Sequence, residues 1–280
     1  GGHVMTALAA DDAFQVREFK GDITKSEAPV DFVRDLDAIV HLAGLNRASD
    51  YDIMNVNSLG TLNLLNAIRS TNPRARLVVA SSFQVYRQWG NRAPLDESIP
   101  PDPQSIYGLS KRFAEDLCRH YSSVGGTRTV ILRLSNVFGP GCLPDYNSVV
   151  ATFIDRALAD RPVQINGDGS SLRDYIYIAD VADSFRAAAR ADTGEAFSIY
   201  NVCSGTMTSL TDIVSLVGRF AGKGPGIDYR TGSSADHAFD PCSNAKALRD
   251  GILKQPLTDF AKAIELTVAE EKRRRAGSSL

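Results

Sequence analysis

The sequence predicts an α/β protein with a doubly wound parallel sheet and a smaller α/β lobe. Continuous apolar stretches, typical of parallel strands buried on both faces, alternate with stretches whose apolar residues recur at helical spacing. This alternation favours right-handed crossovers and a parallel sheet, which binds ligands at the carboxyl ends of its strands. The clearest buried strands are DAIVHLAG (37–44), RLVVASS (76–82) and TRTVILRLSNVFGPG (127–141).

The remaining elements follow from periodicity and turn residues. Residues 1–10 predict a helix, FQVREF (14–19) a short strand, residues 27–36 a weak helix, and residues 51–70 a helix with one apolar face. The polar, Pro-rich residues 84–105 predict a loop. The second half predicts helices at 148–161, 179–191, 209–221 and 257–275, a hairpin at 162–178, and strands at 197–205 and 227–230.

Composition limits the class of protein. The chain has 280 residues, 43% of them apolar, enough for one large domain or a main domain with a lobe. Its net charge of −2 gives no basis for a nucleic-acid or anionic-membrane partner. No apolar run approaches the ~20 residues that span a bilayer, and no signal peptide opens the chain. The four cysteines lack metal-ligand spacing, so we expect no metal and a reduced, cytoplasmic location.

The stretch from Gln104 to Tyr121 carries the strongest chemical signal. It predicts a helix in which Tyr107 and Lys111 are four residues apart and therefore share one face. An ammonium near a phenol lowers its pKa from about 10, so that Tyr107 can exchange a proton with a substrate oxygen. A Tyr-x-x-x-Lys spacing arises by chance in roughly one chain of this length in two. The interpretation therefore depends on its surroundings.

Those surroundings are the ends of the predicted parallel strands. Small or polar residues stand there: Ala43 and Gly44, Ser81 and Ser82, and Asn136. Because the carboxyl ends of parallel strands meet at one edge, Ser82 is expected near Tyr107 and Lys111.

Taken in order, these and other short motifs resemble the extended short-chain dehydrogenase/reductases of the NAD-dependent epimerase/dehydratase family. The resemblance covers roughly residues 20 to 205 and implies a Rossmann-like fold acting on nucleotide sugars. The matching pieces are Gly21-Asp22-Ile23, His41-Leu42-Ala43-Gly44, Asn57-Ser58-Leu59-Gly60-Thr61, Ser81-Ser82, Val85-Tyr86, Tyr107 with Lys111, Leu132-Arg133, Asn136 to Gly141, Gly167-Asp168-Gly169, Arg173-Asp174-Tyr175 and Asp180-Val181-Ala182.

The resemblance also implies roles. Ser82 would hold the reacting sugar oxygen, Tyr107 would move its proton, and Lys111 would also bond the nicotinamide ribose. NAD or NADP would be bound by Gly1, Asp22 (at the adenine), Ile23, Leu42, Ala43, Gly44, Ala80, Tyr107 and Lys111. The nucleotide-sugar substrate would meet Gln84, Asn136 and Arg173.

Simpler interpretations stay open for several of these residues. Asp22 could cap a turn, Ser82 and Asn136 could be strand-end residues, and Arg173 could pair with Asp174 or Asp180. His41 is better explained as a packed strand residue than as a base.

The front of the chain departs from the family pattern. The family opens with a strand and a Gly-rich turn that carries the pyrophosphate on a helix N-terminus, and Gly1 fits only the last glycine of that turn. We expect the sequence to be N-terminally truncated, leaving a groove in the core and unpaired backbone beside it. The residue that would distinguish NAD from NADP cannot be placed.

A second departure narrows the chemistry. Family dehydratases and decarboxylases carry an acid just after the Ser/Thr, where this chain has Phe83 and Gln84. An amide is no general acid or base, which argues against dehydration and decarboxylation.

We therefore expect an NAD(P)-dependent nucleotide-sugar epimerase, most simply a 4-epimerase, with a keto-sugar reductase or a non-catalytic dinucleotide-binding homologue as alternatives. By analogy with the family it would be a homodimer. The dinucleotide domain would comprise 1–137 and 174–202, and the substrate lobe 138–173 and 203–280.

Overall fold

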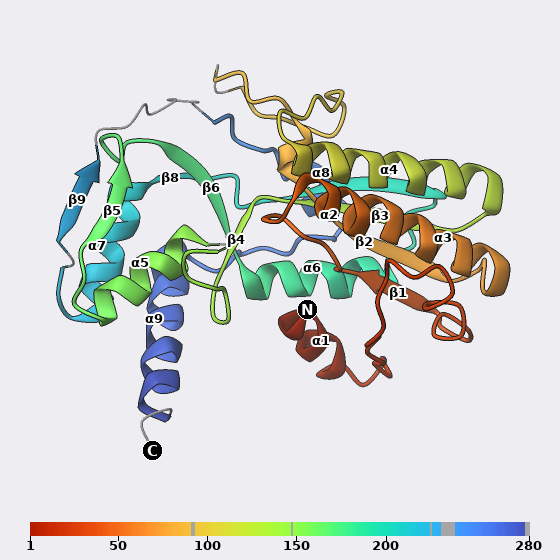
Figure 1. The fold of residues 1–280 in the computed structure, drawn as a ribbon, viewed down its shortest axis with the longest axis horizontal. Helices are drawn as coiled ribbons and strands as arrows, with labels where there is room; N and C mark the ends of the chain where they lie inside the picture. The colour runs from red at the N-terminus through yellow and green to blue at the C-terminus, as the bar shows by residue number, and fades with distance from the viewer. Residues whose placement is uncertain (91–92, 147, 225, 231–238, 278–280) are drawn as a thin grey trace.

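The computed structural model describes residues 1–280 except 91–92, 147, 225, 231–238 and 278–280 (Figure 1). Its centre is a four-stranded sheet in the order β1-β2-β3-β7, with every pair parallel. The predicted α/β class with a parallel sheet is confirmed. The strands are Ala38–His41 (β1), Arg76–Ser82 (β2), Thr129–Leu134 (β3) and Phe197–Val202 (β7).

Side chains that alternate along the strands bury both faces of this sheet. Val78, Val130 and Leu132 face one core, which α1 (Gly2–Ala9) and α6 (Ile178–Arg190) cover. The opposite face packs under α3 (Gly60–Thr71) and α4 (Ile106–Gly125) (Figure 1). Its buried strand residues are Ile39, Leu77, Val79, Ile131 and Ile199.

The helix predicted over residues 51–70 is divided. It consists of α2 (Asp50–Met54), a π-helical turn η1 (Asn55–Leu59) and α3. π-helical turns are rare and often occur at functional sites. This one carries Asn57, which lies at the site described below.

A second core forms in the lobe at the left of Figure 1. Its buried side chains include Phe153, Ile165, Val217 and Ile264. The lobe contains β4 (Asn136–Phe138), α5 (Val149–Leu158), β5 (Val163–Asn166), β6 (Leu172–Tyr177), β8 (Met207–Ser209), α7 (Leu210–Ala221), β9 (Ile227–Arg230) and α9 (Phe260–Gly277). The domain boundaries given above stay a prediction, and residues 231–238 of the proposed lobe lie outside the described part of the chain.

Four sequence predictions about local structure are wrong. The hairpin at 162–178 does not form, because β5 pairs with β9 while β6 joins β4 and β8. Residues 14–19 are not a strand, and residues 27–36 form turns rather than a helix. The stretch 127–141 is two strands in different sheets, β3 and β4. The short elements η2 (Phe83–Val85) and α8 (Ala245–Arg249) were not predicted.

Among the described residues, β1 pairs only with β2. Beside β1 lies a cavity of about 300 Å³ lined by residues of α1, by residues 14–19 and by β1 itself. Phe14 and Val16 form part of the apolar wall of this cavity. This position explains why apolar and polar residues alternate in a segment that is not a strand. The free edge of β1 therefore borders a cavity whose walls are largely apolar.

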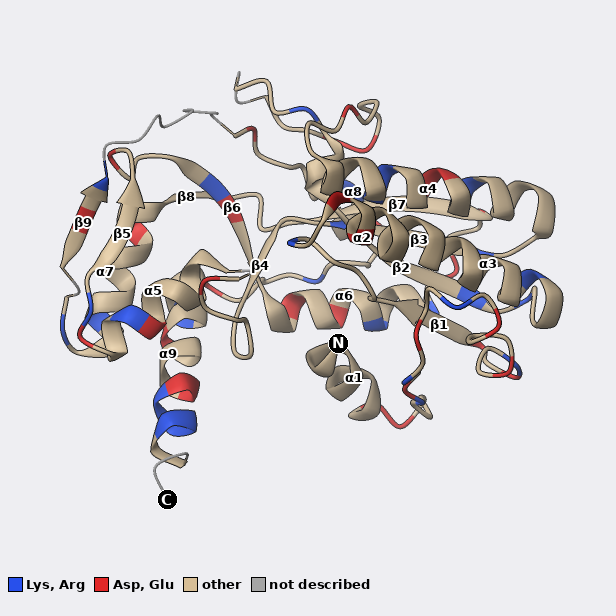
Figure 2. Cartoon of the chain, in the orientation of Figure 1, with Lys and Arg blue, Asp and Glu red and all other residues tan. Residues whose placement is uncertain are grey.

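Charges of both signs are spread over the sheet domain and the lobe (Figure 2). In α9 the basic run is paired, with Arg274 and Arg275 bonded to Glu271. No helix in the described part of the chain is long and apolar enough to cross a membrane.

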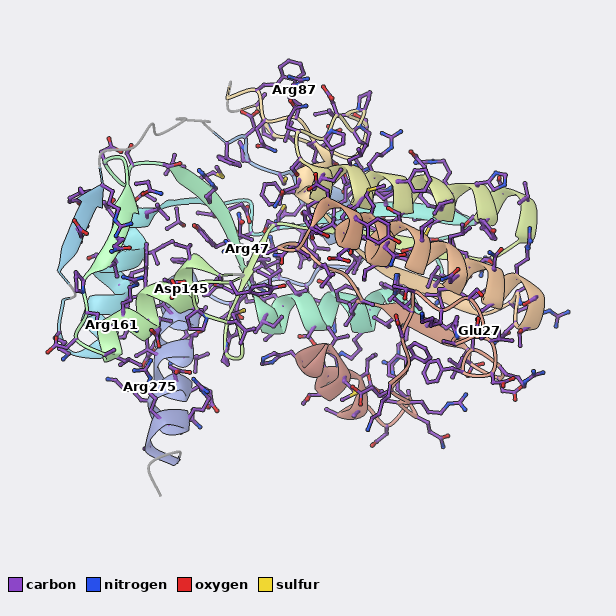
Figure 3. The ribbon with its side chains drawn as sticks, in the orientation of Figure 1. Glu27, Arg47, Arg87, Asp145, Arg161 and Arg275 are labelled. Carbon is purple, nitrogen blue, oxygen red and sulfur yellow. The ribbon has the colours of Figure 1, made fainter. Side chains whose placement is uncertain are left out.

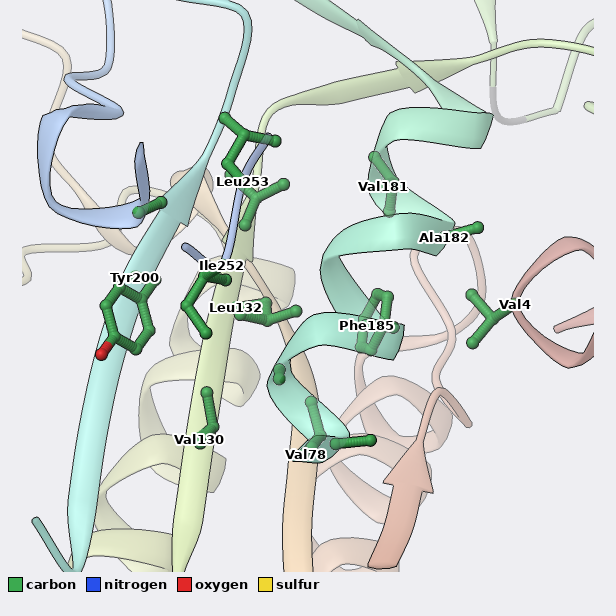
Figure 4. Packing of buried hydrophobic residues seen from close by; sticks show 14 of the residues in the cluster. Val4, Val78, Val130, Leu132, Val181, Ala182, Phe185, Tyr200, Ile252 and Leu253 are labelled. Atoms are coloured by element: carbon green, nitrogen blue, oxygen red, sulfur yellow. The ribbon is translucent and has the colours of Figure 1, made fainter. Parts of the chain in front are cut away.

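Phe185 of α6 tests the core between α1 and the sheet (Figure 4). It is 1% exposed and lies in one cluster with Val4. We expect Phe185→Ala to lower the free energy of unfolding by about 3–5 kcal/mol, because it removes a buried ring and leaves a cavity. Urea denaturation would measure the change. Val124→Ala, at a residue that is 63% exposed, is the control, and its free energy of unfolding should stay within about 0.5 kcal/mol of the parent value. A loss below about 1 kcal/mol for Phe185→Ala would contradict this packing.

Candidate active site

Helix α4 brings Tyr107 to the end of β2. The helix begins after Ser105, whose hydroxyl accepts from Gly108 N at 3.1 Å, and ends at Gly126 in the left-handed region, with φ 72°. Gly108 is packed so closely against Gln84 that a Cβ there would overlap the Gln84 carbonyl oxygen. The first turn of α4 therefore lies directly against the residues that follow β2.

This close approach brings the Ser82 side chain near the Tyr107 phenol, where hydrogen bonding from Ser82 acts to lower the phenol pKa. Ser82 is 6% exposed, and its hydroxyl also accepts from Gln84 N at 3.2 Å, capping η2. Burial raises the pKa of Tyr107 above its ordinary value, and the hydrogen bond with Ser82 opposes this rise. The hydroxyl of Ser82 thus lies beside the phenol of Tyr107 at the end of β2.

Lys111 lies one turn further along α4 and is also buried. Its Nζ donates to the Ala80 carbonyl oxygen at 3.0 Å and lies 5.9 Å from the Tyr107 ring centroid. Burial lowers the pKa of Lys111 to about 8, while the negative charge of Glu115 acts in the opposite direction.

The expectation that Lys111 lowers the pKa of Tyr107 is wrong for the protein without ligands. The pKa of Tyr107 is raised, and burial is the largest cause. The physical reason is geometric, since the ammonium donates to a β2 carbonyl rather than to the phenol oxygen. Tyr107 therefore holds its proton at neutral pH.

Asn57, in the π-helical turn, was not singled out from the sequence, although it stood in a matching motif. Its side-chain amide is 1% exposed and bonds both Leu45 N (2.7 Å) and Leu45 O (2.8 Å). It also donates to the Ser110 hydroxyl at 2.9 Å. Asn57 thereby connects the loop after β1 to α4. Gly44, in the same loop, lies close to both side chains: a Cβ there would be 3.0 Å from Lys111 Nζ and 3.1 Å from Asn57 Oδ1.

His41 is a packed residue at the end of β1. It is 6% exposed, and its Nε2 lies 3.0 Å from the Thr61 hydroxyl. Burial, with the positive charge of Lys111 as a smaller cause, lowers the pKa of His41 to about 3. A base with this pKa is not suited to proton transfer near neutral pH.

A cavity of about 740 Å³ lies between the sheet domain and the lobe, and Tyr107 is on its wall. The three residues predicted to bind substrate, Gln84, Asn136 and Arg173, also line it. Arg47 lines it too, at the junction of the two parts (Figure 3), and donates to the Asp145 carbonyl oxygen at 3.0 Å. Sequence reasoning missed Arg47, whose only signal was its position shortly after the end of β1.

The simpler interpretation, that Arg173 pairs with Asp174 or Asp180, does not match its contacts in the structure. Its guanidinium stacks 3.4 Å from the Phe239 ring centroid and donates to the Ser171 hydroxyl and, at 2.9 Å, to the Leu172 carbonyl. Within the described residues it forms no ion pair with Asp174 or Asp180: Asp174 accepts from Ser204 N and Gly205 N, and Asp180 from Thr258. Asn136 donates to the Asp174 carbonyl at 2.8 Å.

The residues predicted to bind a dinucleotide are divided between two places. Gly1, Ile23, Leu42 and Ala43 line the 300 Å³ cavity beside β1, while Gly44 and Ala80 adjoin Lys111, which lies near Tyr107. Asp22 is exposed, and its Oδ1 accepts from the Thr24 amide and hydroxyl at 2.9 and 2.7 Å, so it does form the turn that the simpler interpretation requires. Apolar lining and a glycine without room for a Cβ fit a flat, closely bound cofactor. These roles stay predictions.

Among the described residues, no group of three or more His, Cys, Asp or Glu side chains could hold a metal ion. A serine, a tyrosine and a lysine gathered at the carboxyl edge of a parallel sheet instead define a short-chain dehydrogenase/reductase. The chain belongs to the NAD dependent epimerase/dehydratase family, whose model matches residues 3–203.

Individual relatives within this family have different activities. The chain is 32% identical over 193 residues to a putative UDP-glucose 4-epimerase of Methanocaldococcus jannaschii, covering 66% of this chain and 61% of that protein. It is 32% identical over 197 residues to a GDP-6-deoxy-D-mannose reductase of Pseudomonas aeruginosa, covering 66% and 63%. The chain therefore spans less than two thirds of the length of these relatives.

A solved structure matches nearly the whole fold. This is the UDP-glucose 4-epimerase of Thermus thermophilus in complex with NAD, at 29% identity and a TM-score of 0.84, covering 97% of this chain and 95% of that one.

The depressed pKa of His41 predicts how stability depends on pH. Between its ordinary pKa of about 6.5 and its folded value of about 3, His41 is protonated in the unfolded chain but neutral in the folded protein. The unfolded state then binds more protons, so this group makes the free energy of unfolding fall as pH falls, by about 1.4 kcal/mol per unit. We expect His41→Asn to reduce the slope by that amount between about pH 4 and 6 in urea denaturation. His120→Asn, at an exposed residue, is the matched control; an unchanged slope in the His41 variant would contradict the prediction.

Proposed function

We propose that this protein is an NAD(P)-dependent nucleotide-sugar epimerase, most simply a 4-epimerase. One observation carries the proposal: Tyr107, with Ser82 and Lys111 close to it at the end of β2, stands on the wall of a 740 Å³ cavity that Arg173 also lines. Cavities of this size accommodate small-molecule substrates. Family membership and the two relatives named above support the same class of reaction.

The residues of this chain would divide the work as follows. Ser82 would hold the reacting sugar hydroxyl, and Tyr107 would take its proton and later return it. Arg173, pre-oriented by Phe239, would bind the substrate diphosphate with its planar guanidinium. A bound oxidised dinucleotide would supply the hydride acceptor. Since Tyr107 is a protonated phenol in the unliganded site, its activation would accompany ligand binding.

Phe83 and Gln84 argue for hydride chemistry without dehydration. Phe83 is 8% exposed and packs in a small core with Val85, so it faces away from the cavity. Gln84 is exposed, lines the cavity and offers only an amide. No carboxylate therefore follows Ser82 to remove a proton from the next sugar carbon.

A keto-sugar reductase is the second candidate, and one observation favours it. The raised pKa of Tyr107 keeps the phenol protonated, which is the form that donates a proton to a keto oxygen. A stoichiometric loss of NADPH absorbance with a keto sugar would select this candidate.

We expect Tyr107→Phe to lower kcat by about 10²–10⁴-fold, because it removes the group that transfers the proton. The assay would incubate the full-length protein with UDP-, GDP- and dTDP-sugars and identify epimers by NMR. Tyr121→Phe, which removes a phenol of the same helix that bonds Asn66, is the matched control and should retain activity. A 4-keto-6-deoxy product would overturn the argument from Gln84. Dinucleotide binding without turnover of any sugar would favour a non-catalytic homologue.

The protein is proposed to be a homodimer joined through α4 and its neighbouring helices. Leu109 and Phe113 lie one turn apart on α4 and are 47% and 45% exposed, and Leu59 is 48% exposed in η1, a turn that packs against α4. Such adjoining apolar side chains are typical of an interface.

We expect Phe113→Glu to convert the dimer to monomers in analytical ultracentrifugation, because a carboxylate would be buried without a partner. Leu266→Glu, in α9 of the lobe, is the control and should leave the mass unchanged. A monomeric parent protein would refute the interface.

A cytoplasmic location remains part of the proposal. All four cysteines are free thiols in the structure, which fits a reducing compartment.

A further inference from the structure

A buried ion pair that the proposed chemistry does not use lies one turn below Lys111. Glu115 and Arg133 are 3% and 2% exposed, and two hydrogen bonds of 2.9 and 2.6 Å join the guanidinium to both carboxylate oxygens. A buried ion pair is weak evidence for stability, because desolvation offsets its attraction and an apolar pair of similar volume is often as stable. This pair therefore calls for another explanation.

Its hydrogen bonds connect the elements that build the site. Glu115 also accepts from the Ser81 hydroxyl at 2.6 Å, directly beside Ser82 in β2. Arg133 also donates to the Tyr86 hydroxyl at 2.6 Å, and that hydroxyl donates to Asn201 Oδ1 at 2.9 Å. The network thus joins α4 to β2, β3 and β7 with its buried donors and acceptors satisfied.

The pair also determines the charge balance around Lys111. Three ionisable side chains lie around this lysine, Glu115 and Tyr107 from α4 and His41 from β1, and Arg133 from β3 is paired with Glu115. His41 and Tyr107 are neutral near pH 7. Glu115 is therefore the one anion in a set with two cations. Burial lowers the pKa of Lys111 to about 8, and Glu115 limits that fall.

We propose that Glu115 is a positioning residue for catalysis: it keeps Lys111 charged and holds the Ser81–Ser82 end of β2 against α4. Arg133 secures the Glu115 carboxylate in the orientation that reaches Ser81. The inference rests on the proposed function, because the charge of Lys111 matters only where Tyr107 exchanges a proton.

Glu115→Gln tests the charge while keeping the shape. Without the carboxylate, two buried cations remain, so we expect the pKa of Lys111 to fall by on the order of one unit. Labelled-lysine NMR would measure it, with the Lys111 signal assigned by its loss in Lys111→Arg. Activity requires charged Lys111 and falls as pH rises through its pKa. The alkaline limb of the kcat/KM profile should therefore move to lower pH by the same amount.

Two further variants separate the charge from the fold. Glu115→Asp keeps the charge and should restore the Lys111 pKa toward the parent value. If Glu115→Gln does not fold, the double variant Glu115→Gln with Arg133→Gln removes the pair without leaving an unpaired buried cation in its place. The Lys111 pKa should still be lowered there, because Glu115 shares a face of α4 with Lys111 and is the charge that acts on it, whereas Arg133 bonds Glu115.

A Lys111 pKa within about 0.3 units of the parent in the Gln variants would overturn the inference. The NMR readout does not depend on turnover. A parent protein that turns over no sugar would therefore refute the proposed function while leaving the role of Glu115 on the Lys111 charge separately tested.

Discussion

The contact between the first three turns of α4 and the last three residues of β2 is the constraint on which the site depends. Tyr107 lies near Ser82, Lys111 donates to the Ala80 carbonyl, and Glu115 accepts from Ser81. Residues four apart on a helix share a face, so one buried face of α4 delivers a phenol, an ammonium and a carboxylate to adjacent positions of one strand. The contact is possible because Gly108 has no Cβ to overlap Gln84.

Such a contact buries charge, and charge buried alone would destabilise the fold. The ammonium of Lys111 is partly compensated by the Ala80 carbonyl and by Glu115, and Glu115 is itself neutralised by Arg133. The ordering of these groups along α4 matters, since the carboxylate lies on the side of Lys111 away from Tyr107. The phenol thus stays near a cation without facing an anion that would oppose its ionisation.

Sequence reasoning recovered those features that follow from local patterns. Apolar runs predicted the parallel strands, and helical spacing placed Tyr107 and Lys111 on one face of α4. It failed where partners distant in sequence decide the structure. Phe14 and Val16 alternate with polar residues because they line a cavity. Strand β5 pairs with the distant strand β9 and not with β6, which follows it in the sequence. The pKa of Tyr107 was misjudged because spacing alone does not reveal that the ammonium points to a carbonyl. Arg133 was visible as a charge inside an apolar strand, yet its partner Glu115 lies 18 residues away.

The loop after β1 and the helix that carries Tyr107 and Lys111 cannot move independently. Asn57 bonds both polar backbone groups of Leu45 and the Ser110 hydroxyl, so one buried amide fixes that loop relative to α4. An amide can do this because it donates and accepts at once, which neither a carboxylate nor an ammonium can. The π-helical turn places Asn57 at this point, and regular α-helical winding would rotate the side chain away. A shift of this loop would therefore displace Ser110, the neighbour of Lys111, and change the surroundings of Lys111.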